Sequence, residues 1–303
     1  MKFEVTILGS SSATPIFNRN PSAQVLNINE HLYLVDCGEG TQQQMLRFDV
    51  KGSRIDHIFI SHLHGDHYLG LVGLLSSMHL NGRTRPLKLF GPPELMEIIN
   101  LQLKYSETTL QYAIDFVVTS REAEVILDNQ DITVETIPLD HRIPTTGFLF
   151  KQKKRLRKIL KEKIEGLDIP VEYYSAIKKG EDYLSPEGKI YKNGDITVSP
   201  DEPKTYAYCS DTLYNENYFK QISNADLLYH EATFLNNMLD RAQSTHHTTA
   251  LQAGDVAIKT NAKRLLIGHF SARYKTLNEL LDEARSVFPD TELAIEGKTF
   301  VIS

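Results

Sequence analysis

Short apolar runs separated by polar turns dominate much of this 303-residue chain. Runs rich in Val, Ile, Leu and Phe that end at Gly, Pro, Asn or Asp are typical of successive β-strands. We therefore predict strands at residues 3–8, 23–28, 32–35, 57–60, 116–119, 124–127, 132–138, 147–151, 204–209, 227–231, 264–269 and 292–295.

Helical stretches appear between these strands. Residues 69–80 place Leu71, Leu74, Leu75 and Met78 where one face of a helix would bury them. We also predict helices at residues 42–48, 92–103, 218–222, 250–260 and 276–287. Strand-to-helix units in both halves of the chain indicate an α/β protein in which two sheets pack together with helices outside.

Residues 151–200 follow neither pattern and are rich in Lys and Tyr with scattered Gly and Pro. We interpret them as an inserted, mobile arm rather than a second domain. The arm begins with residues 151–163, which hold eight Lys and Arg residues against Glu162 alone, a local charge of +7. Because the whole chain carries −6, the remainder carries −13. A compact basic segment on an acidic chain favours a polyanionic ligand, with a solvated helix face as the alternative.

The composition is that of an ordinary globular protein, with 41% apolar and 24% charged residues. The length allows one large domain or two small ones. The chain shows no run of about 18 apolar residues and no signal peptide, so we expect a cytoplasmic protein with no membrane partner. Cys37 and Cys209 are the only cysteines, which indicates no disulfide framework.

The strongest chemical signal is the run His-Leu-His-Gly-Asp-His at residues 62–67, directly after a predicted strand. A strand that ends in a glycine-containing turn can direct His62 and His64 to one point and Asp66 and His67 to a neighbouring one. Imidazole nitrogens and carboxylate oxygens are good ligands for zinc-like ions. The run therefore predicts two adjacent metal ions, and a polar loop that happens to be rich in histidine is the alternative.

Further ligand-type residues also follow predicted strands directly. They are Asp140-His141, Ser210-Asp211 and Gly268-His269. A single histidine is more often a surface or hydrogen-bonded core residue than a ligand. The repeated position after a strand, shared with His62, favours the metal site instead.

These residues make the chain resemble the metallo-β-lactamase fold superfamily and, within it, the ribonuclease Z family of tRNA 3′-end processing endonucleases. The resemblance covers essentially the whole chain. It implies a four-layer αβ/βα sandwich as a single domain over residues 1–303, with the site between the sheets at one edge and residues 151–200 as an inserted tRNA-binding arm. It implies one ion on His62, His64 and His141, a second on Asp66, His67 and His269, Asp211 as the bridge, and Asp36 in support. Zinc is the expected metal and manganese the alternative.

Two further motifs narrow the resemblance. His230-Glu231-Ala232-Thr233 is similar to the family's HEAT signature, and His247-Thr248-Thr249 to its His-Ser-Thr motif with Thr at the Ser position. In the family this histidine is not a ligand, and the HEAT glutamate orients it. The alternative for His247 is a surface histidine in the loop before a helix.

The resemblance implies metal-assisted hydrolysis of a phosphodiester in precursor tRNA. Asp66 would orient the attacking water and accept its proton, and His247, held by Glu231, would donate a proton to the departing 3′ oxygen. The products would be a tRNA with a 3′-hydroxyl and a trailer with a 5′-phosphate. Substrate contacts are expected from Arg273, in the segment Ser271-Ala272-Arg273-Tyr274, and from Lys178 and Lys179 of the arm. A homodimer is implied by the resemblance alone.

The chain departs from the family in two places. The arm lacks the Gly-Pro motif that precedes its Lys-rich stretch in the family and reads Pro170-Val171-Glu172-Tyr173-Tyr174 instead. A loop written Pro-x-Lys-x-Arg-Asn in the family carries Phe17 in place of the lysine. The alternatives are a small-molecule phosphodiesterase or thioester hydrolase on the same fold, and a non-catalytic nucleic-acid-binding protein with structural metals.

Overall fold

The computed structural model describes residues 2–14, 16 and 18–303, so Pro15 and Phe17 of the N-terminal loop lie outside the described residues. The chain forms two compact units. The larger unit runs up to Lys151 and resumes at Lys204, and the smaller one is formed by Gln152–Pro203. Each unit has a hydrophobic core of its own.

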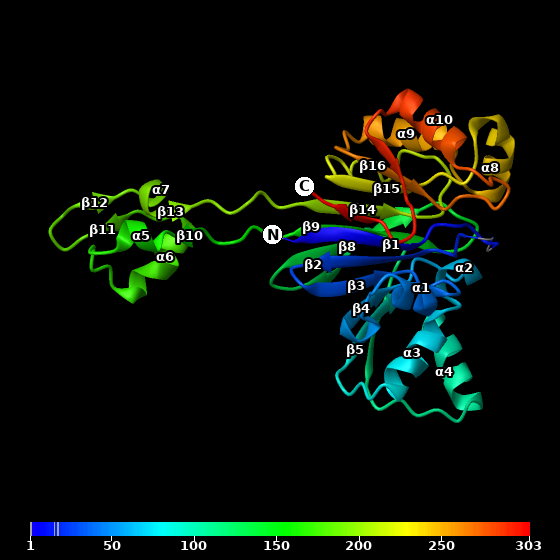
Figure 1. Cartoon of the computed structure of the whole chain (residues 1–303), viewed down its shortest axis with the longest axis horizontal. Coiled ribbons are helices and arrows are strands. Elements are labelled where there is room, and N and C mark those ends of the chain that lie inside the picture. The colour runs from blue at the N-terminus through cyan, green and yellow to red at the C-terminus, as the bar shows by residue number, and fades with distance from the viewer. Residues whose placement is uncertain (1, 15, 17) are drawn as a thin grey trace. The chain divides into compact units, whose positions relative to one another are not determined.

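The larger unit is built on two seven-stranded sheets (Figure 1). The first has the order β18-β1-β2-β3-β4-β5-β6 and the second β17-β16-β15-β14-β9-β8-β7. The strands of the first sheet are β1 (Phe3–Gly9), β2 (Ala23–Ile28), β3 (His31–Val35), β4 (Ile55–Phe59), β5 (Leu87–Gly91), β6 (Ile114–Val118) and β18 (Thr299–Val301). Those of the second are β7 (Val125–Asp128), β8 (Ile132–Leu139), β9 (Thr145–Gln152), β14 (Thr205–Cys209), β15 (Leu227–Glu231), β16 (Leu265–Gly268) and β17 (Thr291–Leu293).

The two sheets pack face to face through aromatic side chains. The ring of Phe59 in the first sheet lies 5.3 Å from that of Phe148 and 5.4 Å from that of Phe150 in the second, both edge to face. All three are fully buried in one continuous apolar cluster. Alternation along the strands explains this layer, because every second side chain of each sheet points to the same face.

Helices cover the outer face of each sheet (Figure 1). Buried residues of α1, α3 and α4 share one apolar cluster with the first sheet, and those of α9 and α10 share another with the second. The helices of this unit are α1 (Thr41–Arg47), α2 (Gly65–Tyr68), α3 (Leu71–Leu80), α4 (Leu95–Tyr105), α8 (Leu239–Thr245), α9 (Ala250–Lys259) and α10 (Asn278–Val287), with 3-10 turns at Gly52–Arg54 and Asn236–Met238. The predicted sandwich of two sheets with helices outside is therefore confirmed.

Some predicted elements differ from the structure. The helix expected at residues 218–222 is wrong, because residues 217–224 form consecutive hydrogen-bonded turns. Most of its backbone hydrogen bonds join residues three apart, such as Phe219 N–H to Glu216 O and Gln221 N–H to Tyr218 O, rather than four apart as in an α-helix. The strands β5 and β18 and the helix α8 were not predicted.

The smaller unit is made of very short elements. Ile169, Ile177, Tyr183 and Ile196 form its buried core. Its elements are β10 (Lys158–Ile159), α5 (Lys161–Ile164), a 3-10 turn (Val171–Tyr173), α6 (Tyr174–Lys179), β11 (Tyr183–Leu184), β12 (Ile190–Tyr191), α7 (Asn193–Ile196) and β13 (Thr197–Val198). Two-stranded sheets join β10 to β13 and β11 to β12.

The strand directions bring the candidate site together. In the second sheet β14, β15 and β16 are mutually parallel, and in the first β4 is parallel to both β3 and β5. The carboxyl ends of parallel strands meet at one edge of a sheet, where polar residues can converge without disturbing the core. Among the described residues, no helix is long and apolar enough to cross a membrane.

Candidate metal centre and active site

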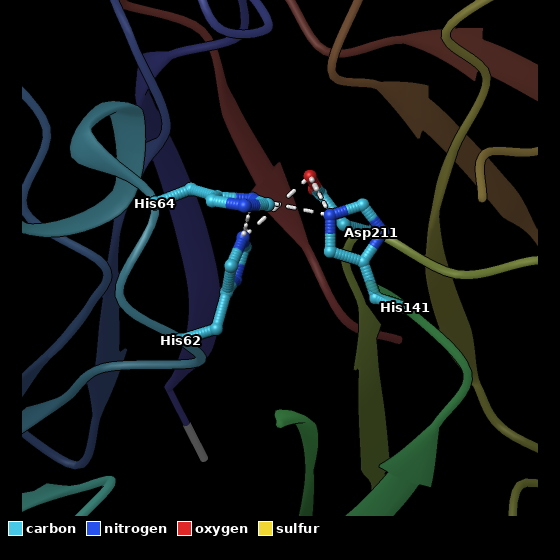
Figure 2. Close-up of side chains that lie close together, drawn as sticks. All are labelled: His62, His64, His141 and Asp211. Carbon is cyan, nitrogen blue, oxygen red and sulfur yellow. Dashed lines mark hydrogen bonds and ion pairs between the residues drawn. The ribbon is translucent and has the colours of Figure 1, made fainter. Parts of the chain in front are cut away.

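The first group of ligand-type side chains comprises His62, His64, His141 and Asp211 (Figure 2). His64 Nδ1 lies 3.1 Å from His62 Nε2 and 3.1 Å from His141 Nε2. Asp211 Oδ2 lies 3.6 Å from His62 Nε2 and 3.7 Å from His141 Nε2. Three imidazole nitrogens and a carboxylate oxygen thus converge on one point.

The second group comprises Asp66, His67 and His269, and Asp211 faces it as well. Asp66 Oδ2 lies 3.4 Å from His67 Nε2 and 3.3 Å from His269 Nε2. Asp211 Oδ1 lies 3.3 Å from His67 Nε2 and 3.1 Å from His269 Nε2. One carboxylate therefore presents its two oxygens to the two different groups, as a bridging ligand requires.

The chain leading to these residues explains their directions. His62 and His64 follow β4, whereas Asp66 and His67 lie on the short helix α2, which begins at Gly65. The turn expected at the glycine is thus the first turn of a helix. The change from extended to helical backbone directs the second pair of side chains away from the first.

Several of the ring nitrogens that point away from the two groups have hydrogen-bond partners. His67 Nδ1 lies 2.7 Å from Asp36 Oδ2, and His141 Nδ1 lies 2.8 Å from the carbonyl oxygen of His246. Each acceptor fixes the proton on Nδ1, which leaves the Nε2 lone pair free to bind a cation. His67 Nε2 itself is buried and has no hydrogen-bond partner among the described atoms. This donor set fits divalent metal ions.

Burial and the neighbouring charges together shift the pKa values of these side chains. Burial and the neighbouring imidazole of His67 lower the pKa of His62 well below its usual value. Burial would raise the pKa of Asp211, but the imidazoles of His269 and His67 hold it well below its usual range. Burial would lower the pKa of His67, but the carboxylates of Asp66 and Asp211 raise it well above. Ionised carboxylates in a buried cluster therefore call for positive charge at this point.

Asp36 supports the second group from inside the core. Its carboxylate accepts hydrogen bonds from the Ser61 amide at 2.8 Å, the Ser61 hydroxyl at 2.9 Å and the Tyr208 hydroxyl at 2.7 Å. Its backbone has a φ of 56°, and that of His269 has a φ of 58°. Left-handed conformations are costly for residues other than glycine and are found preferentially at functional sites.

Glu231 and His247 form a separate pair beside the metal-type groups. His247 Nδ1 lies 3.0 Å from Glu231 Oε1, and Glu231 is fully buried. Burial would lower the pKa of His247, but the Glu231 carboxylate raises it to about 9. His247 also lies within ligand distance of Asp211 and His269. The imidazole can therefore hold a proton next to the point where the two groups meet.

A cavity of about 480 Å³ is lined by His64, Asp66, Asp211, His247 and His269. Its rim includes three guanidinium groups, from Arg142, Arg241 and the predicted Arg273. Arg273 lies over the ring of Phe234 at 5.2 Å, and its Nε donates to the Ser271 hydroxyl. Sequence reasoning missed Arg142 and Arg241, although Arg142 directly follows the candidate ligand His141.

Lys178 and Lys179 lie in the smaller unit, at the end of α6, and both are exposed. With Lys154, Arg155 and Arg157 they line a cavity of about 410 Å³ within that unit. Five basic side chains around one hollow make a surface suited to phosphate groups. Glu202 is the one acidic residue in the same lining.

Comparison with known structures places this architecture in a recognised class. The metallo-beta-lactamase fold protein YhfI of Bacillus subtilis superposes with a TM-score of 0.69 over 99% of this chain and 100% of that one, at 19% identity. The protein therefore has the metallo-β-lactamase fold and carries two His/Asp groups suited to metal ions.

Sequence relatives narrow the class to a family. A Ribonuclease Z of Bacteroides fragilis is 45% identical over 297 residues, which are 98% of this chain and 98% of that protein. Human tRNase Z, short form, superposes with a TM-score of 0.73 at 26% identity and covers 99% of both chains. The family model described as Anti-Pycsar protein Apyc1 also matches residues 3–157. The chain belongs to the ribonuclease Z family.

Proposed function

We propose that this protein is a metal-dependent endoribonuclease that removes 3′ trailers from precursor tRNA. The observation that carries the proposal is the convergence of two His/Asp groups with the Glu231–His247 pair in a member of the ribonuclease Z family. The reaction leaves a 3′-hydroxyl on the tRNA and a 5′-phosphate on the trailer. Small phosphodiesters and thioesters are the competing substrates on this fold.

Two divalent ions are proposed, with zinc preferred over manganese because imidazole nitrogens predominate among the donors. His62, His64 and His141 would hold one ion, and Asp66, His67 and His269 the other, with Asp211 shared. Metal ions bound there supply positive charge to the phosphate oxygens and lower the pKa of water toward about 7. The hydrogen-bond partners of His67, His141 and His269 support this assignment.

The chain's own side chains move the protons. Asp66, whose pKa is held below its usual range by His67 and His269 despite burial, orients the attacking water and accepts its proton. His247 donates a proton to the departing 3′ oxygen, and Glu231 holds the ring by its Nδ1 proton. A proton donor placed in this way contributes about 10²- to 10⁴-fold to the rate.

Substrate phosphates are proposed to bind at two places. Arg273, with Arg142 and Arg241, binds phosphates that flank the scissile bond at the rim of the cavity. Lys178 and Lys179 of the inserted arm, residues 151–200, bind the tRNA backbone. The +7 charge of residues 151–163 supports the arm's role, because an acidic chain otherwise repels nucleic acid.

We also propose a homodimer in the cytoplasm. Leu46 on α1 and Leu80 on α3 are 84% and 80% exposed, and a cavity of about 790 Å³ lined by Met45, Leu74 and Met78 lies beside Leu46. Exposed apolar side chains of this size are typical of protein interfaces. Sedimentation of the wild type and of a Leu46→Glu variant tests the dimer. Cys37 and Cys209 are buried thiols, which suits a reducing compartment.

The proposed function is tested with a 3′-extended precursor tRNA and with bis(p-nitrophenyl) phosphate as two substrates. We expect chelator-sensitive cleavage of the precursor at the base of the acceptor stem. Hydrolysis of the small ester alongside an intact precursor would assign the protein to the small phosphodiesterases instead.

A further inference from the structure

Thr233 lies between the metal-type groups and the proton-donating pair, and neither role accounts for it. It follows β15 and is 2% exposed. Its hydroxyl oxygen lies 2.6 Å from Glu231 Oε2 and 2.9 Å from His269 Nδ1. It also lies 3.0 Å from the carbonyl oxygen of His269. One hydroxyl therefore contacts both halves of the candidate site.

Counting protons fixes the direction of these hydrogen bonds. A threonine hydroxyl has one proton to donate. The shortest contact is to the buried carboxylate of Glu231, and a bond from a hydroxyl to a carboxylate is stronger than one to a neutral acceptor. The proton therefore goes to Glu231, and the hydroxyl oxygen accepts from His269 Nδ1–H. His269 Nε2 then faces Asp66 and Asp211 with its lone pair available to a cation.

Glu231 also holds the backbone next to Asp211, the proposed bridging residue. Its Oε1 accepts from the Thr212 amide at 2.8 Å as well as from His247 Nδ1. Thr212 follows Asp211 directly, so the same carboxylate holds the backbone beside the bridge. The Glu231 carboxylate is fully buried and depends on these donors for its charge.

We propose that Thr233 is a positioning residue that joins the two halves of the site by holding Glu231 with its proton and His269 with its oxygen. Thr233 touches neither substrate nor metal and acts through His269 on one side and Glu231 on the other. The proposal deepens the proposed function and rests on its metal site, since it states which hydroxyl orients one ligand.

Thr233→Val tests the proposal, because valine keeps the shape and removes the hydroxyl. Without the oxygen the Nδ1 proton of His269 has no acceptor, and the ring loses its fixed orientation. Loss of such a partner lowers metal affinity about 10- to 100-fold. The measurement is a titration of the metal-stripped full-length protein with Zn²⁺ against a chromophoric chelator, and we expect one of two sites to weaken.

Two matched variants separate the hydroxyl from general damage. Thr233→Ser keeps the hydroxyl, and its Zn²⁺ affinity should stay close to that of the wild type. Thr260→Val removes a buried hydroxyl that donates to the carbonyl oxygen of Val256 in α9, remote from the ligands, and should leave Zn²⁺ binding unchanged. Thermal melting of the metal-free proteins shows whether Thr233→Val and Thr260→Val lose similar stability.

The outcomes are distinct. Wild-type Zn²⁺ affinity in Thr233→Val, or equal weakening in Thr233→Ser, would overturn the role of the hydroxyl while the metal site stands. A wild type that takes up no Zn²⁺ and leaves precursor tRNA intact would overturn the proposed function and the role of Thr233 with it.

Discussion

At the scale of single residues, the proposed proton donor His247 is the group expected to distinguish cleavage of RNA from hydrolysis of an activated ester. His247→Ala should lower precursor cleavage about 10²- to 10⁴-fold, because the 3′ oxygen leaves poorly without a proton. Hydrolysis of bis(p-nitrophenyl) phosphate should change far less, since p-nitrophenolate is a weak base. Elemental analysis should find the full metal content, and loss of metal would contradict the non-ligand role.

The Glu231 carboxylate should govern the pH range of the reaction. His247 donates only when protonated, so activity should persist up to its pKa of about 9 and fall as the pH rises through that value. In Glu231→Gln, burial still lowers the pKa of His247, but the carboxylate charge that raised this pKa is absent. The alkaline limb of the pH–rate profile should therefore move downward toward 6.5, the ordinary value. If the alkaline limb does not move, a group other than His247 determines it.

Sequence reasoning found the ligand-type residues because four of them form one run at residues 62–67 and the others directly follow predicted strands. The structure brings them together in two groups. Their roles as ligands stay a prediction. Arg142 and Arg241 gave no such signal, because the sequence alone does not distinguish an arginine that lines a site from any other exposed arginine. The partners of the imidazoles, such as the His246 carbonyl oxygen, depend on distances that only the folded chain sets.

At the scale of elements, the sequence predicted most strands to within two residues, since their apolar runs end at turn-forming residues. It missed β5, and it missed the edge strand β18, whose three residues are too few to show a period. Residues 217–224 form turns although Tyr218, Phe219 and Ile222 have helical spacing. All three are buried against α9 and α10 without forming a helix.

The inserted unit should matter for tRNA and not for small substrates. The double variant Lys178→Ala, Lys179→Ala should bind the precursor more weakly. The slope of log K against log[salt] should fall by up to about one for each lysine, because each can contact one phosphate. Hydrolysis of bis(p-nitrophenyl) phosphate should be unchanged. The same pair of changes at Lys104 and Lys220, exposed on the larger unit, provides the control.

Equal losses on tRNA and on the small ester would contradict the assignment of the arm. Replacing residues 152–203 with a short linker should lower tRNA cleavage even more while small-ester hydrolysis persists, because the larger unit holds every candidate catalytic residue. Without the family's Gly-Pro motif, the basic cavity that includes Lys178 and Lys179 is the arm's best candidate for backbone contact.

At the scale of the whole molecule, charge is divided between the parts of one chain. Residues 151–163 carry +7 and the remainder −13, so basic groups are concentrated in the inserted segment and at the rim of the active-site cavity. Such a distribution favours a polyanion that is held at these two places and repelled elsewhere. A small phosphodiester would contact only the arginine side chains that line the cavity.

The most direct test of the proposed function is incubation of the protein with a 3′-extended precursor tRNA, with and without a metal chelator. We expect one cut at the base of the acceptor stem, a 3′-hydroxyl on the tRNA, loss of cleavage with chelator and recovery on adding Zn²⁺ or Mn²⁺. An intact precursor in the presence of metal, with active hydrolysis of bis(p-nitrophenyl) phosphate, would contradict it.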